Sequence, residues 1–346
     1  MVDPRVIRLA DILVNHSLEI KEGERVLINA PSEAAPLVKE IYRKILQNGG
    51  IPITDISIPG LQKIFFEESN EKQLSDIEVY EMIYKKVDAL VAINASVNTK
   101  ELTNVDVQKM QTYQKSFQPI MDYILKEKVK WVGSFFPTNS LAQDAEMSLE
   151  EYEDFLFNAT NIDYIQLSEM MNKTVTYFNQ ANVVRIIANQ TDITIDIEGR
   201  EAIVNQGKHN IPDGEFFFTP NYLLTEGTIF CEWPVLFQGR ELQGLHLTFK
   251  DGKIFKYSAD IGQDLLEHIL NTDNGACYLG KLGIGTNPNI LNPIKNILFD
   301  EKIGGSIHLA IGNASSINWN MVKNLKDNGE IYLDNMLVFK KGNWLL

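Results

Sequence analysis

The first half of the chain alternates segments of helical periodicity with short apolar runs. Asp3 and Pro4 form a typical helix start, and apolar positions follow at helical spacing over residues 7–13. The same spacing returns after Ser32 and ends at Gly49 and Gly50, and a long polar helix is expected over 101–127. Apolar runs predict strands at 23–30, 51–58, 87–94 and 129–136. This alternation predicts a parallel sheet with helices on both faces.

The pattern changes near residue 183. Short, alternating strands separated by turn residues continue to residue 312, and an Asp-Gly pair at 251–252 predicts a tight hairpin. One helix is expected near 261–271. A length of 346 residues exceeds one ordinary domain. We therefore predict an α/β fold in which a parallel-sheet α/β domain (1–180) is followed by a β-rich α+β domain (181–346).

Composition narrows the range of partners and surroundings. The chain has 46 acidic and 32 basic residues, a formal net charge of −14. Nucleic acids and anionic membranes require a basic surface, so neither is expected as a partner. The N-terminal segment lacks the unbroken apolar run of a signal peptide, and no stretch approaches the length of a membrane span. Cys231 and Cys277 have no metal-ligand spacing. A cytoplasmic location is expected.

The common local catalytic motifs are absent. The chain has no Gly-rich phosphate loop followed by lysine, no G-x-S-x-G elbow and no H-E-x-x-H pair. None of its five histidines lies three to five residues from another, so no local metal pair is formed. His308 differs from the rest because it lies within a mostly apolar predicted strand, where an imidazole needs a polar partner.

Several long blocks, in one order, carry a resemblance to a known family. They are ADILVNHSLEIKEGERVLI, SLAQDAEMSLEEYEDFLFNA, NIPDGEFFFTP, TDNGACYLGKLGIGTNPNI, NILFDEKIGGSIHLAIG and SINWNMV. The chain resembles the thermophilic metallo-aminopeptidases of the aminopeptidase T and aminopeptidase S type over nearly its whole length. That resemblance implies a two-domain enzyme that trims peptide N-termini with a pair of divalent metals, and it implies a homodimer.

The positions that match the family's metal ligands are only partly preserved. Glu215 and His308 stand where the resemblance places a glutamate and a histidine. Lys281 occupies the position of a glutamate, and Asn318 and Asn320 replace a histidine and an aspartate. The loop that usually carries a ligand tyrosine is shortened to residues 313–316. The resemblance thus identifies two surviving metal positions and three replaced ones, and it assigns no catalytic residue.

These replacements change the charge of the expected site. An asparagine amide is a poor ligand for zinc, cobalt or manganese, and a lysine ammonium has no lone pair to donate. The loss of two carboxylates and the gain of one lysine raise the charge of the ligand set by three units, whereas two divalent metals supply four. We therefore predict that Lys281 pairs with Glu215 and takes the place of metal charge.

Three interpretations of function remain open. The first is a family member with its dimetal site largely lost, weakly active or non-catalytic, which binds a peptide or amino-acid-like ligand through Lys281, Asn318 and Asn320. The second is an active aminopeptidase with a rearranged site, in which one zinc, cobalt or manganese ion binds Glu215, His308 and an acid among Glu226, Glu232, Asp300 and Glu301. The third is a single-metal enzyme of different chemistry on the same fold. The expected cofactor is therefore none or one divalent metal.

Overall fold

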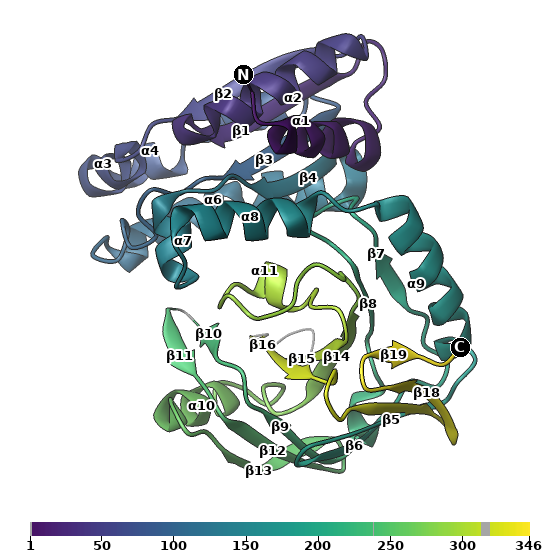
Figure 1. Cartoon of the computed structure of the whole chain (residues 1–346). Helices are drawn as coiled ribbons and strands as arrows, with labels where there is room; N and C mark the ends of the chain where they lie inside the picture. Colours follow the sequence, from purple (N-terminus) through teal and green to yellow (C-terminus); the bar gives the residue numbers. More distant parts are fainter. Residues whose placement is uncertain (1, 238, 313–318) are drawn as a thin grey trace. The chain divides into compact units, whose positions relative to one another are not determined.

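The chain forms two compact units, which Figure 1 draws in a computed structural model. The structure describes residues 2–237, 239–312 and 319–346. Unit 1 comprises Met1–Asn161 and Gly207–Ile211, and unit 2 comprises Ile162–Gln206 and Pro212–Leu346. Within these described ranges, no helix has both the length and the apolar character needed to cross a membrane.

Unit 1 is built on a four-stranded sheet in the order β2-β1-β3-β4, and every neighbouring pair is parallel. The strands are β1 (Arg25–Pro31), β2 (Ile51–Ser57), β3 (Ala89–Asn94) and β4 (Lys130–Phe135). The parallel sheet predicted from the apolar runs is confirmed. Residues 207–211 return to this sheet beside β4, where the amide of Gly133 donates to the carbonyl of His209 at 2.8 Å.

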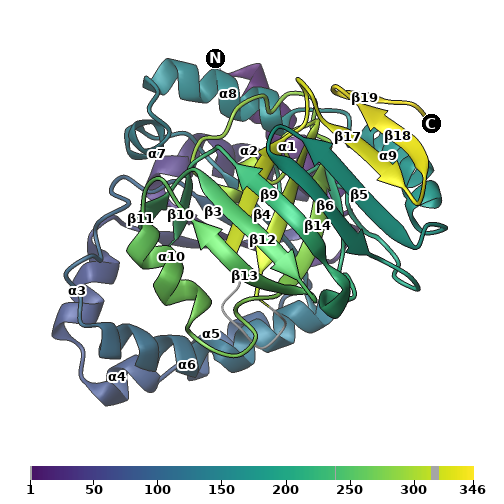
Figure 2. The same ribbon diagram turned by 90° about the horizontal axis from the view of Figure 1, so that it is seen from below.

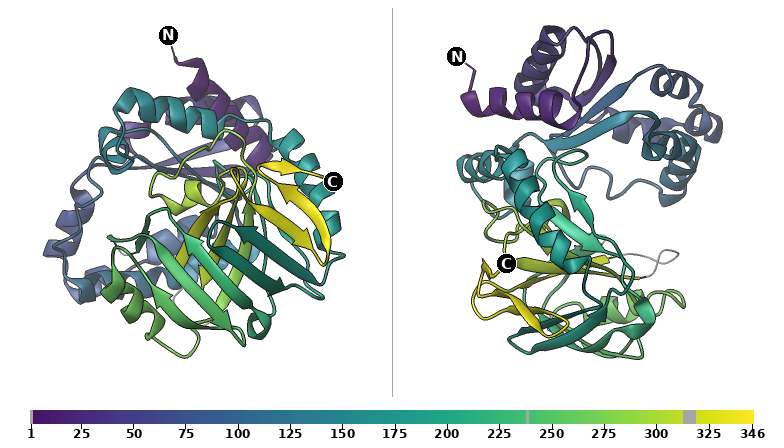
Figure 3. Two further views of the ribbon diagram at one scale, coloured as in Figure 1. Left: turned by 60° about the horizontal axis from the view of Figure 1, so that its bottom comes forward. Right: turned by 90° about the vertical axis from the view of Figure 1, so that its right-hand side faces the viewer.

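The described residues of unit 1 form the α-helices α1 (Pro4–Asp11), α2 (Ala35–Gln47), α3 (Leu61–Glu68), α4 (Glu71–Ser75), α5 (Glu78–Tyr84), α6 (Val107–Tyr123), α7 (Asn139–Asp144) and α8 (Leu149–Thr160). Asp3 caps α1 as predicted, since its side chain accepts a hydrogen bond from the amide of Arg5 at 2.8 Å. The helix expected over 101–127 begins later, because Asp106 caps α6 through the amide of Gln108. Figure 3 shows helices on both faces of the sheet.

Unit 2 contains an eight-stranded antiparallel sheet, which Figure 2 shows from below. Its order is β13-β12-β9-β6-β5-β17-β18-β19. The strands are β5 (Val183–Ala188), β6 (Thr191–Asp196), β9 (Glu226–Cys231), β12 (Leu245–Lys250), β13 (Lys253–Ser258), β17 (Glu330–Leu333), β18 (Met336–Lys340) and β19 (Asn343–Trp344). The predicted hairpin joins β12 and β13, with Asp251 and Gly252 both at positive φ.

The second sheet of unit 2 has five antiparallel strands in the order β16-β15-β14-β8-β7. They are β7 (Ile203–Asn205), β8 (Glu215–Phe218), β14 (Leu279–Gly285), β15 (Ser306–Ile311) and β16 (Trp319–Asn324). All six residues of β15 are buried, so this strand runs through the core. The described residues of unit 2 also form a separate hairpin of β10 (Val235–Phe237) and β11 (Arg240–Leu242) and the helices α9 (Tyr164–Phe178), α10 (Gln263–Leu270) and α11 (Ile297–Asp300).

The compact units differ from the expected ranges 1–180 and 181–346 in two places: α9 lies in unit 2, and residues 207–211 lie in unit 1. This helix lies in unit 2, because its buried residues pack beside β8. Phe178, at the end of α9, stacks against Phe218 of β8 with ring centroids 5.8 Å apart. The α/β half and the β-rich half that the sequence predicts are both present.

Candidate functional site

Strand register places Glu215 and His308 on one face of the five-stranded sheet. Glu215 begins β8 and pairs with Gly285 of β14. Two positions along, Phe217 pairs with Gly283, which in turn pairs with His308 of β15. Residues directly opposite in neighbouring strands, and residues two apart in one strand, share a face. The two surviving metal positions predicted from the sequence therefore converge.

Two glycines of β14 make room for this site. A Cβ built on Gly283 would overlap the imidazole ring of His308, so the ring occupies the space where a side chain would stand. A Cβ on Gly285 would meet the backbone carbonyl oxygens of Ile303 and, at 3.0 Å, Glu301. The glycines thus allow His308 to lie across β14 and allow the segment after α11 to approach the sheet.

That segment carries a buried lysine. Lys302 extends its Nζ to 2.9 Å from Oε1 of Glu215 and also pairs with Glu301. The side chains of Lys302 and Glu215 are each only 1% exposed, and Glu301 is 12% exposed. One buried carboxylate and one partly buried carboxylate therefore share one buried ammonium, which offsets the cost of removing their charges from water.

Lys281 brings a second ammonium to the same carboxylates. Its Nζ lies 3.4 Å from Oε1 of Glu215 and 3.7 Å from Oε2 of Glu301. The same Nζ stands 4.1 Å from the centroid of the Phe217 ring, a cation–π contact. The side chain keeps 22% of its surface exposed. The predicted pairing of Lys281 with Glu215 is confirmed.

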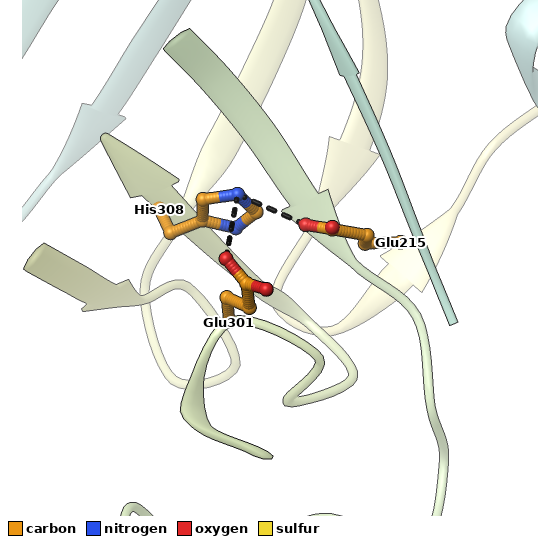
Figure 4. Close-up of side chains that lie close together, drawn as sticks. All are labelled: Glu215, Glu301 and His308. Carbon is orange, nitrogen blue, oxygen red and sulfur yellow. Dashed lines mark ion pairs between the residues drawn. The ribbon is translucent and has the colours of Figure 1, made fainter. Parts of the chain in front are cut away.

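His308 completes the cluster drawn in Figure 4. Its Nε2 lies 3.0 Å from Oε2 of Glu215 and 3.8 Å from Oε2 of Glu301. Both ring nitrogens are buried, and neither has a hydrogen-bond partner within the part of the chain that the structure describes. The contact with Glu215 is therefore an electrostatic one at short distance. The side-chain amide of Asn205 on β7 also donates to Oε1 of Glu215, at 2.7 Å.

Neighbouring groups in the cluster shift the pKa values of Glu215 and Lys302. Burial alone would raise the pKa of Glu215, but electrostatic interactions with the neighbouring imidazole of His308 and with the ammonium of Lys302 outweigh it and hold that pKa well below its usual value. Burial would lower the pKa of Lys302, yet the carboxylates of Glu215 and Glu301 raise it above its usual value. Glu215 is thus held as a carboxylate and Lys302 as an ammonium.

Glu215, Glu301 and His308 each offer one potential metal-ligating atom, and these atoms lie within 4.8 Å of one another. The other three acids considered from the sequence bond elsewhere. Glu226 accepts the amide of Asp251, Glu232 pairs with Lys323, and Asp300 accepts the amide of Ile294 at 2.8 Å. Burial raises the pKa of Asp300 to about 7.

The two asparagine positions have different outcomes. Asn318 and residues 313–316 lie outside the described residues. Asn320 pairs with Ala310, and Ala310 pairs with Lys281, so the three share a row across the sheet. Two strand spacings separate the backbones of Asn320 and Lys281 by roughly 10 Å. Oδ1 of Asn320 is buried and has no hydrogen-bond partner among the described residues.

Sequence reasoning missed Lys302. A lysine that follows Asp300 and Glu301 has the pattern of a solvated surface charge. One signal was available. The replaced ligands raise the charge of the site by three units, one fewer than the four units that two divalent metals supply. Lys302 supplies one more positive charge at the same carboxylate.

Known structures share this architecture. The wild-type AmpT structure from Thermus thermophilus aligns with a TM-score of 0.84 at 19% identity, covering 99% of each chain. A structure of 2,5-dihydroxypyridine dioxygenase from Pseudomonas putida KT2440 aligns with a TM-score of 0.59 at 12% identity, over 98% of this chain and 96% of the other. At these identities the likeness establishes the fold, the α/β half followed by the β-rich half that the sequence predicts.

Sequence comparison gives the family. Aminopeptidase 2 of Geobacillus stearothermophilus is 26% identical over 349 residues, which cover 90% of this chain and 84% of that protein. The family model described as thermophilic metalloprotease (M29) matches residues 2–332. That family is one of metal-dependent peptidases, and three potential metal-ligating residues meet in unit 2. The chain belongs to the thermophilic metalloprotease family M29.

Proposed function

We propose that this protein is an M29 family member in which lysine charges replace the metal pair, and that it binds an amino-acid-like or peptide ligand without two-metal hydrolysis. The observation that carries the proposal is the contact of both Lys302 and Lys281 with Glu215, at 2.9 and 3.4 Å. Relatives are named aminopeptidases, which supports a peptide or amino-acid-like ligand.

The residues present do not fit a pair of divalent metals. Zinc, cobalt and manganese bind anionic or imidazole donors at about 2.0–2.3 Å, so an ion on Glu215 would come close to the Lys302 ammonium. Like charges at such distances repel by several kcal/mol even at an intermediate effective dielectric constant. Two ammonium groups already neutralise the two carboxylates of Glu215 and Glu301. Metal binding would require both lysines to move away or lose their protons.

The outer part of the cluster suggests which ligand chemistry fits. Glu215, Lys302 and His308 are at most 1% exposed, so a ligand cannot touch them without rearrangement. Lys281 and Glu301 keep 22% and 12% of their side-chain surfaces. One is cationic and the other anionic, and Phe217 adjoins Lys281. A zwitterion with an apolar side chain, such as an amino acid, complements these three groups.

Metal analysis and peptidase assays test the absence of two-metal chemistry. We expect freshly purified protein to contain no stoichiometric zinc, cobalt or manganese and to leave leucyl anilide intact with added cobalt. A variant with Lys281→Glu, Lys302→Gln, Asn318→His and Asn320→Asp removes both ammoniums and restores acidic and imidazole donors. It should gain metal and a thermal stabilisation on zinc addition. Stoichiometric metal together with turnover in the unaltered protein would overturn the proposal.

Calorimetric titration tests the ligand separately. We expect L-leucine to bind, and 4-methylpentanoic acid and 3-methylbutylamine, which each lack one charged group, to bind at least about tenfold more weakly. Lys281→Met should abolish the advantage of leucine over the amine. Lys340→Met, which alters an exposed pair with Glu330, is the matched control. Equal binding of all three compounds would contradict a zwitterion site.

A single-metal aminopeptidase is the second candidate. Its support is the convergence of Glu215, Glu301 and His308 within 4.8 Å, enough donors for one ion if Lys302 withdraws. The same metal analysis distinguishes it, because it requires one ion per chain and loss of activity on chelation. The likeness to a dioxygenase concerns the fold alone, so different single-metal chemistry has no support of its own.

A further inference from the structure

A second group of polar and aromatic side chains gathers in unit 1, apart from the carboxylate–lysine cluster. Asp55 lies near the carboxyl end of β2, beside Asn29 of β1, whose side-chain amide donates to Oδ2 of Asp55 at 2.9 Å. These two strand positions are register partners, so their side chains share one face of the sheet. That face also carries Leu27, two residues before Asn29.

The helices that cover this face bring tyrosines to it. Leu27 belongs to a buried cluster against which Tyr84 of α5 and Phe117 of α6 pack. Tyr113 lies one helical turn before Phe117 on α6, and Tyr80 lies one turn before Tyr84 on α5. Figure 2 shows the labels of α5 and α6 close together along the lower edge of the view.

The rings form a connected group around Phe117. Its centroid lies 5.1 Å from Tyr113, 5.5 Å from Tyr80 and 6.4 Å from Tyr84. The planes are tilted or perpendicular, at 42°, 56° and 86°, so the rings present faces and edges in several directions. Tyr80 is 43% exposed, and Tyr84 and Tyr113 are half-buried, so part of the group is accessible to solvent.

The group includes one carboxylate, that of Asp55. Across the described residues, Asp55 takes part in no ion pair, and no hydrogen bond engages the hydroxyls of Tyr80, Tyr84 or Tyr113. Burial, and then the charges of Tyr80, Tyr84 and Asp55, raise the pKa of Tyr113 to about 12. Burial and Asp55 likewise raise the pKa of Tyr84. Tyr84 and Tyr113 therefore keep their phenol protons at physiological pH, and a neutral phenol ring retains the negative face that attracts a cation.

We propose that Asp55, Tyr80, Tyr84 and Tyr113 form a binding site for a small organic ammonium ion. A carboxylate beside several tyrosine faces is the chemistry that recognises alkylammonium groups, because the rings attract a poorly hydrated cation and the carboxylate neutralises it. A metal ion is a poor match, since one carboxylate and neutral phenols supply too few anionic donors. This site is independent of the cluster around Glu215.

The test is an NMR titration of the full-length protein labelled at its tyrosine rings. Choline is the probe, and 3,3-dimethylbutan-1-ol, which has the same shape without the charge, is its neutral control; sodium chloride keeps the ionic strength constant. We expect choline to shift the Tyr80, Tyr84 and Tyr113 signals saturably and the alcohol to leave them unchanged. Asp55→Asn should weaken binding by about tenfold or more, and Tyr113→Phe should retain it because the ring face remains.

A matched control is Asp122→Asn on α6, an exposed aspartate that accepts a hydrogen bond from Gln118, which should leave choline binding unchanged. Tyr80→Ala removes an exposed ring and gives a second variant with little risk to folding. It should weaken binding while the melting temperature stays near that of the unaltered protein. Shifts that never saturate, that occur equally with the alcohol, or that survive both Asp55→Asn and Tyr80→Ala would overturn the proposal.

Discussion

Nζ of Lys302 lies 2.9 Å from Oε1 of Glu215, and both side chains are 1% exposed. An ion pair removed so fully from water is costly to leave half-made, because the remaining charge loses its partner without regaining solvent. In this protein the pair occupies the place where the family resemblance puts a metal ligand. The contribution of this ion pair to the stability of unit 2 therefore bears on the proposed replacement of the metals by lysine charges.

Lys302→Met should destabilise the protein by about 3–5 kcal/mol, since it leaves Glu215 buried beside the weaker contact of Lys281. Chemical denaturation at neutral pH measures the free energy of unfolding. Lys281→Met should cost less, because Lys281 is 22% exposed and lies at 3.4 Å. The reverse order of the two losses would contradict the assignment of Lys302 as the principal partner.

Lys323 provides a comparison with another buried lysine. Its side chain is 2% exposed, but its partner Glu232, at 2.8 Å, keeps 37% of its surface and can be hydrated without the lysine. Lys323→Met should therefore change the free energy of unfolding by about 1 kcal/mol or less, as for a surface pair. A loss as large as that of Lys302→Met would show that lysine burial, and not the partner's burial, sets the cost.

Gly283→Ala should be strongly destabilising, by roughly 1–3 kcal/mol or more, because the new methyl group overlaps the His308 ring. His308→Ala in the same chain should recover part of that loss, which a double-mutant cycle on thermal or chemical unfolding measures. Gly133→Ala is the control glycine, since its Cβ would find its nearest neighbour at an ordinary 3.6 Å. Strictly additive losses at Gly283 and His308 would contradict the packing described.

The raised pKa of Tyr113 gives stability an alkaline dependence. The phenol titrates near pH 10 when unfolded and at about 12 in the folded protein. Between these values the unfolded state releases a proton that the folded state keeps, so stability falls as pH rises from about 10 to 12. Melting curves of the unaltered protein and Tyr113→Phe should therefore diverge over that window, with the variant falling less. Parallel curves would indicate an ordinary pKa.

Local sequence signals determined most of the architecture. The cap at Asp3, the paired glycines after the second helix and the apolar runs predict the elements of unit 1 because these effects act within a few residues. The Asp251-Gly252 hairpin has the same local origin. The position of α9 was set otherwise, because the packing of Phe178 against β8 is a contact between distant segments.

The family resemblance carried by the sequence predicts Glu215 and His308 as surviving metal positions, and the sequence also predicted that Lys281 would pair with Glu215. It left open which acid would join them. Glu226, Glu232, Asp300 and Glu301 all carry a carboxyl group, and the sequence does not show which of them lies near Glu215. Only the tertiary structure selected Glu301 and revealed Lys302. The approach of the segment after α11 to Gly285 buries that lysine against a strand far away in sequence. Because Lys302 is buried, it becomes the principal partner of Glu215. A low-dielectric interior strengthens the attraction between the two charges and makes the loss of either one costly to stability.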